Sequence, residues 1–251
     1  MYSWDAEARR YLDSLTESLR GSGLMEWLTT TISDVWSINM DRYEPASLGD
    51  TARAFGVLSS DNIQQRALRA SREGQGPWGE GRARATNPEG SLLITASGVD
   101  IHILKAPRTG SRTPAWERDF KWTTKSYSRL NASARNTLIK GPVTSTAGQT
   151  ALFETTPQSG NEASNTFSDV FLVWSGDETS GLTAGWLGIP VLGPSPWVAV
   201  SPPLWWDETG RSSIRSAPLP ALPTDAANFD SLEEPKPTIR MKPLVSKEEQ
   251  S

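Results

Sequence analysis

The chain has 251 residues, 36% of them hydrophobic, which is enough for one large domain, and its formal net charge is −4. It contains no cysteine and one histidine, so disulfides, thiolate zinc sites, iron–sulfur clusters and zinc sites with several imidazoles are excluded. Any Ser-His-Asp triad would have to use that single histidine, His102.

Two amphipathic helices are predicted at the start of the chain, over residues 4–20 and 24–40. Apolar side chains recur there at spacings of three and four, and glycines separate the two patterns. Asp61 and Gln64 have the spacing of a capping box, which predicts a third helix over residues 61–72.

Strand patterns follow a glycine-rich loop. Residues 91–104 predict two strands joined at Ser97 and Gly98, a favourable hairpin turn. Further strands are predicted over 120–130, 149–154, 169–175, 183–191 and 197–201.

The order of these elements predicts an α+β fold, with N-terminal helices packed on a mostly antiparallel sheet. One domain is expected over residues 1–210, helical over 1–72 and sheet-rich over 90–205. Residues 211–251 contain six prolines in a polar background and are predicted to form an extended or disordered tail.

The sequence also limits location and cofactors. No apolar run approaches the roughly 20 residues of a membrane span, and the first residues lack an apolar segment of signal length. We therefore expect a cytoplasmic protein that does not enter a membrane. No pattern indicates a cofactor, and the oligomeric state is left open.

Charge is distributed unevenly along the chain. Residues 51–140 carry 15 Lys and Arg against 7 Asp and Glu, whereas residues 141–210 carry no basic residue and 7 acidic ones. Such asymmetry concerns partners more than fold. The arginine-rich middle predicts contacts to an anionic partner, with nucleic acid favoured and a tyrosine stacking on a base. The candidate contacts are Arg66, Arg69, Arg82, Arg84, Lys121, Lys125, Tyr127 and Arg129, the last four on one face of the predicted strand 120–130.

A protein partner is the alternative if the acidic flanks neutralise this region. The tail over 211–251 holds a PxxP sequence and an acidic-hydrophobic segment, either of which suits a groove on another protein. Tryptophan could add contacts, because the adjacent Trp205 and Trp206 cannot both face inward from a strand. Trp174 and Trp186 are expected in the core.

A third hypothesis is catalytic. Asp100 and His102 are predicted to share the exposed face of a strand that ends at Lys105, and Glu89 precedes the hairpin. This arrangement resembles the metal-dependent nuclease core of restriction enzymes. The resemblance implies Mg²⁺ held by Glu89 and Asp100, with Lys105 or His102 assisting the attacking water. It departs from that pattern at Ile103, where the family has an acid, and alternation directs Lys105 away from Asp100. The favoured hypothesis is therefore a non-catalytic binding or regulatory protein.

Overall fold

Three helices come first: α1 (Ala6–Gly21), α2 (Leu24–Met40) and α3 (Ala52–Glu73). The computed structural model describes residues 4–107, 112–122, 126–140 and 167–207, all within the compact unit Met1–Gly210. Asp5 begins α1 by accepting hydrogen bonds from the backbone amides of Glu7 and Ala8. Gly23, with φ 76°, allows the sharp turn into α2.

The third helix begins nine residues earlier than the sequence predicts. Thr51 is its N-cap and accepts a hydrogen bond from the amide of Ala54, at 3.1 Å. Asp61 therefore lies inside the helix, on its exposed side. The predicted capping box was wrong because Ser, Thr and Asp also occur within helices, where they face solvent.

In the described ranges, seven strands form one sheet: β1 (Arg84–Thr86), β2 (Leu93–Ala96), β3 (Val99–Lys105), β4 (Asp169–Gly176), β5 (Thr183–Pro190), β6 (Trp197–Val200) and β7 (Trp205–Trp206). The strand order is β1-β2-β3-β4-β5-β6, and β7 pairs with β5. All pairs are antiparallel except β3 with β4. The predicted α+β fold with a mostly antiparallel sheet is confirmed.

The hairpin between β2 and β3 also agrees with the sequence. Ser97 and Gly98 have φ values of 51° and 77°, as a two-residue type I′ turn requires. A single-turn helix, η1 (Pro88–Gly90), precedes β2.

The parallel pair is joined by a crossover that contains α4 (Tyr127–Lys140). A strand predicted over 120–130 is therefore wrong. The buried residues of α4 are Ala132, Ser133 and Asn136, which have helical spacing but little apolar character. The strand predicted over 149–154 and the tail predicted over 211–251 lie outside the described residues.

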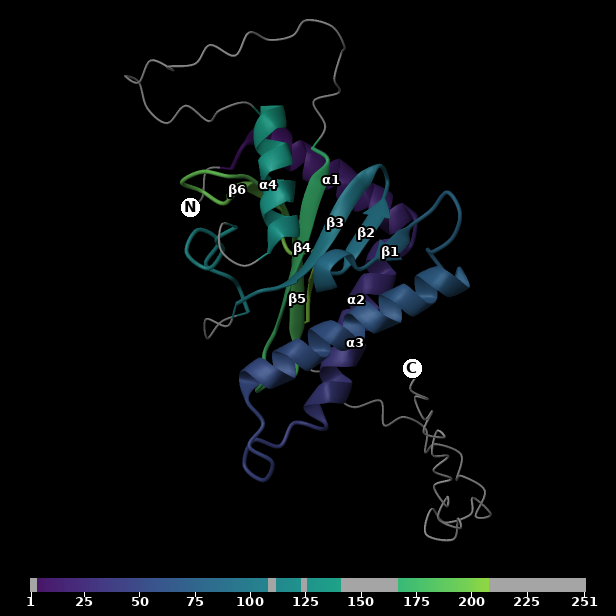
Figure 1. The fold of residues 1–251 in the computed structure, drawn as a ribbon, viewed down its shortest axis with the longest axis vertical. Coiled ribbons are helices and arrows are strands. Elements are labelled where there is room, and N and C mark those ends of the chain that lie inside the picture. Colours follow the sequence, from purple (N-terminus) through teal and green to yellow (C-terminus); the bar gives the residue numbers. More distant parts are fainter. Residues whose placement is uncertain (1–3, 108–111, 123–125, 141–166, 208–251) are drawn as a thin grey trace, which may run out of the picture. The chain divides into compact units, whose positions relative to one another are not determined.

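Both faces of the sheet are covered. Helices α1 to α3 pack on the face that carries Ile101, Leu172 and Leu187. The other face carries Phe171 and Val173 and is covered by α4 and by an aromatic cluster of Trp116, Phe120, Trp122 and Trp197. Figure 1 shows α4 beside β4, with α1 and α2 behind the strands. Every residue of β5 is buried as a result.

Tryptophans occupy space that glycines of β5 leave open. A Cβ atom added at Gly185 would collide with the ring of Trp205, and one at Gly188 would collide with the ring of Trp197. Trp205 is buried, whereas its neighbour Trp206 is 39% exposed, as strand alternation predicts. Among the described residues, no helix has the length and apolar content needed to cross a membrane.

Candidate functional site

An arginine-lined groove lies between α2 and α3. The two helices are joined by buried amides, since Asn39 donates to the Ser59 hydroxyl at 3.0 Å and Asn62 donates to Asn39 at 3.2 Å. Beside these contacts opens a groove of about 260 Å³. Its lining residues include no Asp or Glu and are Val35, Ile38, Asn39, Arg42, Asn62, Gln65, Arg66 and Arg69. We call it the arginine groove.

Three guanidinium groups reach this groove. Arg66 and Arg69 come from one side of α3, as their spacing of three predicts, and Arg42 comes from just beyond the end of α2. All three side chains are exposed, and none makes a hydrogen bond or ion pair with a described residue. Arg42 was missed at the sequence level because only the packing of α2 against α3 brings it to the other two.

The basic character continues past the end of α3. Residues 64–84 carry five arginines and two acids. Arg72 and Arg82 each donate to a backbone carbonyl, of Leu68 and Gly76 respectively. Arg84 is exposed on the edge strand β1, which is attached to α3 by a hydrogen bond from the Ala85 amide to Ser71, at 2.9 Å.

The remaining predicted contacts lie elsewhere. Lys121 is exposed in the segment before α4, Tyr127 is 67% exposed at the start of α4, and Lys125 lies outside the described residues. Arg129 is half-buried on the same helix. Lys121, Tyr127 and Arg129 do not share a strand face, and α4 covers the sheet face opposite to α1–α3.

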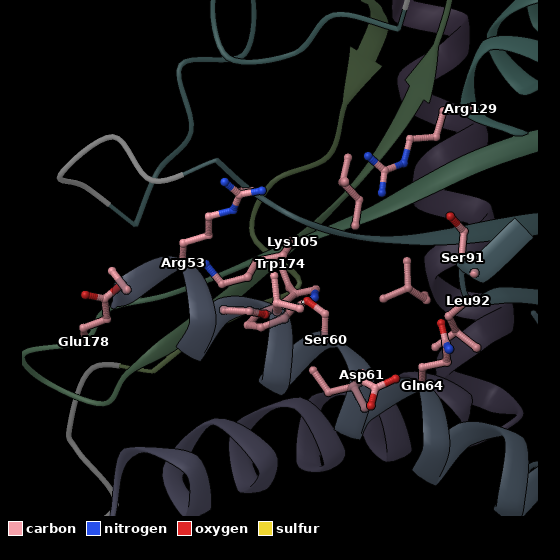
Figure 2. Close-up of a pocket in the computed structure, with 18 residues that line it drawn as sticks. Arg53, Ser60, Asp61, Gln64, Ser91, Leu92, Lys105, Arg129, Trp174 and Glu178 are labelled. Atoms are coloured by element: carbon pink, nitrogen blue, oxygen red, sulfur yellow. Dashed lines mark hydrogen bonds between the residues drawn. The ribbon is translucent and has the colours of Figure 1, made fainter. Parts of the chain in front are cut away.

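A larger hollow lies at the carboxyl ends of β3 and β4. Its volume is about 740 Å³, and its walls come from the first half of α3, residues 90–92, the end of β3 and Arg129 of α4 (Figure 2). Lys105 lines it, with Nζ 5.3 Å from the ring centroid of Trp36 and 5.7 Å from that of Trp174. We call this hollow the β3–β4 pocket.

The four residues of the nuclease hypothesis do not form one cluster. Glu89 is exposed in η1, and Asp100 accepts a hydrogen bond from the Thr95 hydroxyl at 2.8 Å. Lys105 lies on the α3 side of β3, where Gly56 packs against its side chain, so alternation places it opposite Asp100. In the described part of the chain, no three His, Asp or Glu side chains are placed to hold a metal ion.

His102 is buried, not exposed as the sequence predicts, because α4 and the aromatic cluster cover its face of the sheet. Its Nε2 atom lies 3.1 Å from Oδ1 of Asp169, and its Nδ1 atom has no hydrogen-bond partner among the described residues. The ring packs on Phe171, with 5.0 Å between centroids.

Asp169 is the centre of a buried polar network that the sequence did not predict. Arg135 of α4 donates two hydrogen bonds to its carboxylate, and the Ser168 hydroxyl donates a third at 2.7 Å. Burial alone would raise the pKa of Asp169, but the hydrogen bonds from His102, Arg135 and Ser168 outweigh it and lower the pKa to about 2. The network holds α4 against the start of β4, and Asn136 adds a hydrogen bond to the Asp169 carbonyl at 2.8 Å.

Comparison of the chain with protein-family models, with curated proteins and with solved structures finds no match.

Proposed function

We propose that this protein is a non-catalytic, cytoplasmic binding or regulatory protein that holds nucleic acid on the arginine groove. The observation that carries the proposal is the set of three guanidinium groups, Arg42, Arg66 and Arg69, around a groove with no acidic lining residue. One guanidinium group can donate two parallel hydrogen bonds to the oxygens of a phosphate. Three such groups around one groove therefore suit a ligand that carries phosphates.

The surroundings of the groove support a linear polyanion over a small anion. Arg72 adds a basic residue in the last turn of α3, and Arg82 and Arg84 add two more beyond the end of the helix. The amides of Asn62 and Gln65 lie among the arginines and can bond phosphate or sugar oxygens. An acidic protein surface is the competing partner, and the tail over residues 211–251 is a second place where a protein could bind.

The test is the salt dependence of binding to a single-stranded oligonucleotide of about 20 nucleotides, by fluorescence anisotropy between about 50 and 200 mM salt. For single strands, each lost phosphate contact lowers the steepness of the plot of log binding constant against log salt concentration by about 0.7. The triple variant R42Q/R66Q/R69Q is expected to lower the slope by about 2 and to weaken binding at least tenfold at low salt.

The matched control is R9Q/R10Q/R20Q, which removes the same number of charges from exposed positions of α1. It should change the slope by less than about 0.5, since these arginines lie outside the groove. Equal weakening by both triple variants would show that net charge, and not the groove, drives binding. Absence of binding at low salt would end the nucleic-acid proposal and favour an acidic protein partner.

A further inference from the structure

The β3–β4 pocket is separate from the arginine groove, although α3 lines both. The helix presents Arg53, Gly56 and Ser60 to the pocket, and its other side presents Asn62, Gln65, Arg66 and Arg69 to α2. The volume of about 740 Å³ is within the range of small-molecule sites. Its base is apolar, because Ile63, Leu104 and Trp174 are all at most 6% exposed.

Arg129 supplies a positive charge that no residue in the described part of the chain neutralises. Its guanidinium group is half-buried, makes no hydrogen bond or ion pair with a described residue, and is turned toward the middle of the pocket in Figure 2. Burial lowers the pKa of Arg129. Arg135, on the same helix, is different: its hydrogen bonds to Asp169 raise its pKa. A partly buried cation without a partner is unfavourable, and an anionic ligand would remove that cost.

A second unpaired polar group faces the same space. Gln64 is only 9% exposed, lines the pocket, and its side-chain amide forms no hydrogen bond with any described residue. Figure 2 shows Arg129, Ser91 and Gln64 along one end of the pocket and Glu178 at the other. The amide atoms of Gln64 are still reached by solvent, since the fully buried side-chain polar atoms that lack a partner in the described part of the chain are Trp78 Nε1 and His102 Nδ1. Gln64 therefore offers an open hydrogen-bonding group to a ligand at this end of the pocket.

The charged residues that line the β3–β4 pocket indicate which kind of ligand it binds. Arg53, Lys105 and Arg129 outnumber the acids Asp61 and Glu178 by one. Asp61 is exposed to solvent, and Glu178 lies across the pocket from Arg129 (Figure 2). One uncompensated positive charge beside an apolar base fits a ligand with one negative charge and an apolar body.

We infer that the β3–β4 pocket binds an organic monocarboxylate, with the carboxylate on Arg129 and Gln64 and the apolar body over Ile63, Leu104 and Trp174. The guanidinium group suits this head because it can donate two parallel hydrogen bonds to one carboxylate. Gln64 then supplies a further donor from the α3 wall.

The probe is octanoate, titrated into the full chain by calorimetry, with octanol and octyl phosphate as comparison ligands. We expect octanoate to bind at least tenfold more tightly than either, because octanol lacks the charge and octyl phosphate carries a second one. Arg129→Gln should weaken octanoate at least tenfold and leave octanol unchanged. Arg53→Gln, at an exposed position of the same pocket, should change octanoate affinity less than about threefold.

The melting temperature of the ligand-free protein shows whether Arg129 serves to bind a ligand or to stabilise the fold. Arg129→Gln should melt at or above the wild-type temperature, since it removes an unpaired, half-buried charge. A fall of several degrees would make Arg129 a structural residue and overturn the inference. Octanol binding as tightly as octanoate, tighter binding of octyl phosphate, or no octanoate binding would each overturn it too. Octanoate binding should be unaffected in R42Q/R66Q/R69Q, so failure here and failure of the nucleic-acid proposal are distinguishable.

Discussion

Asp169→Asn is expected to lower the free energy of unfolding by about 3 kcal/mol, because a fully buried carboxylate loses the charge-assisted hydrogen bonds from Ser168 and from Arg135, whose own side chain is 49% exposed. Asp169 is fully buried and accepts hydrogen bonds from Arg135 and Ser168, and His102 lies within hydrogen-bonding distance. Asparagine keeps the size of the side chain but loses the charge that Arg135 pairs with. A loss of this size should lower the melting temperature by roughly 10 °C for a unit of this length.

Asp100→Asn is the matched control. Asp100 is the residue of β3 that pairs with Asp169 of β4, so the two positions are neighbours in the sheet. It is half-exposed, and its side chain accepts a single hydrogen bond, from Thr95. The same substitution there should cost less than about 0.5 kcal/mol in denaturant unfolding. Similar losses in both variants would show that the Asp169 network does not contribute more than an ordinary surface carboxylate.

The same network predicts how stability depends on pH. The pKa of Asp169 falls from 3.8 to about 2 on folding, so the unfolded chain binds the proton more tightly than the folded one. The contribution of Asp169 is therefore fully present above pH 3.8 and is lost as the pH falls toward 2. In denaturant unfolding, the free energy of unfolding of the wild type should be lower at pH 2.5 than at pH 5. In Asp169→Asn, the part of this fall that comes from Asp169 should be absent. An unchanged difference would mean that other carboxylates cause the acid sensitivity.

Gly185→Ala is expected to destabilise the protein by about 3 kcal/mol or more, near the upper end of what overpacking costs. The added methyl group would overlap the buried ring of Trp205, which hydrogen-bonds Thr183 through its indole nitrogen at 3.0 Å. The ring has little freedom to move, because Trp205 belongs to β7 and β7 is paired with β5. Chemical denaturation followed by circular dichroism measures the change.

Gly21→Ala is the control for the effect of the methyl group itself. Gly21 is the last residue of α1, and a Cβ atom there meets nothing within 4 Å. Alanine favours helix over glycine, so this variant should be neutral or more stable by up to about 1 kcal/mol. If Gly185→Ala behaved like Gly21→Ala, the close packing of Trp205 on β5 would not be a constraint on the fold.

Local patterns in the sequence predicted the elements that depend on neighbouring residues. The periodicity of α1 and α2, and the turn at Ser97 and Gly98, are properties of short segments that remain the same in any fold. The sequence did not predict α4, because the helix buries Ala132, Ser133 and Asn136 and so has no apolar stripe to recognise. Phe120 and Trp122, which produced the strand pattern, pack into the aromatic cluster from an irregular segment.

The candidate sites depend on residues that are distant in the chain. The arginine groove needed Arg42 from beyond α2. Arg129 was predicted on an exposed strand face but lines the β3–β4 pocket, as Gln64 and Ser91 do. Asp169 meets His102 across 67 residues and Arg135 across 34. Sequence spacing carries no information about such contacts until the crossover between β3 and β4 is known.

The parallel pairing of β3 with β4 also governs when a growing chain can complete its core. β3 pairs early with β2, but its other edge stays open until Asp169 and the residues after it have been synthesised. The first helix completes its contacts later still, because the Asp5 amide donates to the carbonyl of Val198 in β6. A nascent chain that stops before β6 therefore exposes apolar surface on α1 and a free strand edge, the two features that attract chaperones and cause aggregation. Since its earliest and latest elements share one core, this unit becomes stable only near the end of its translation.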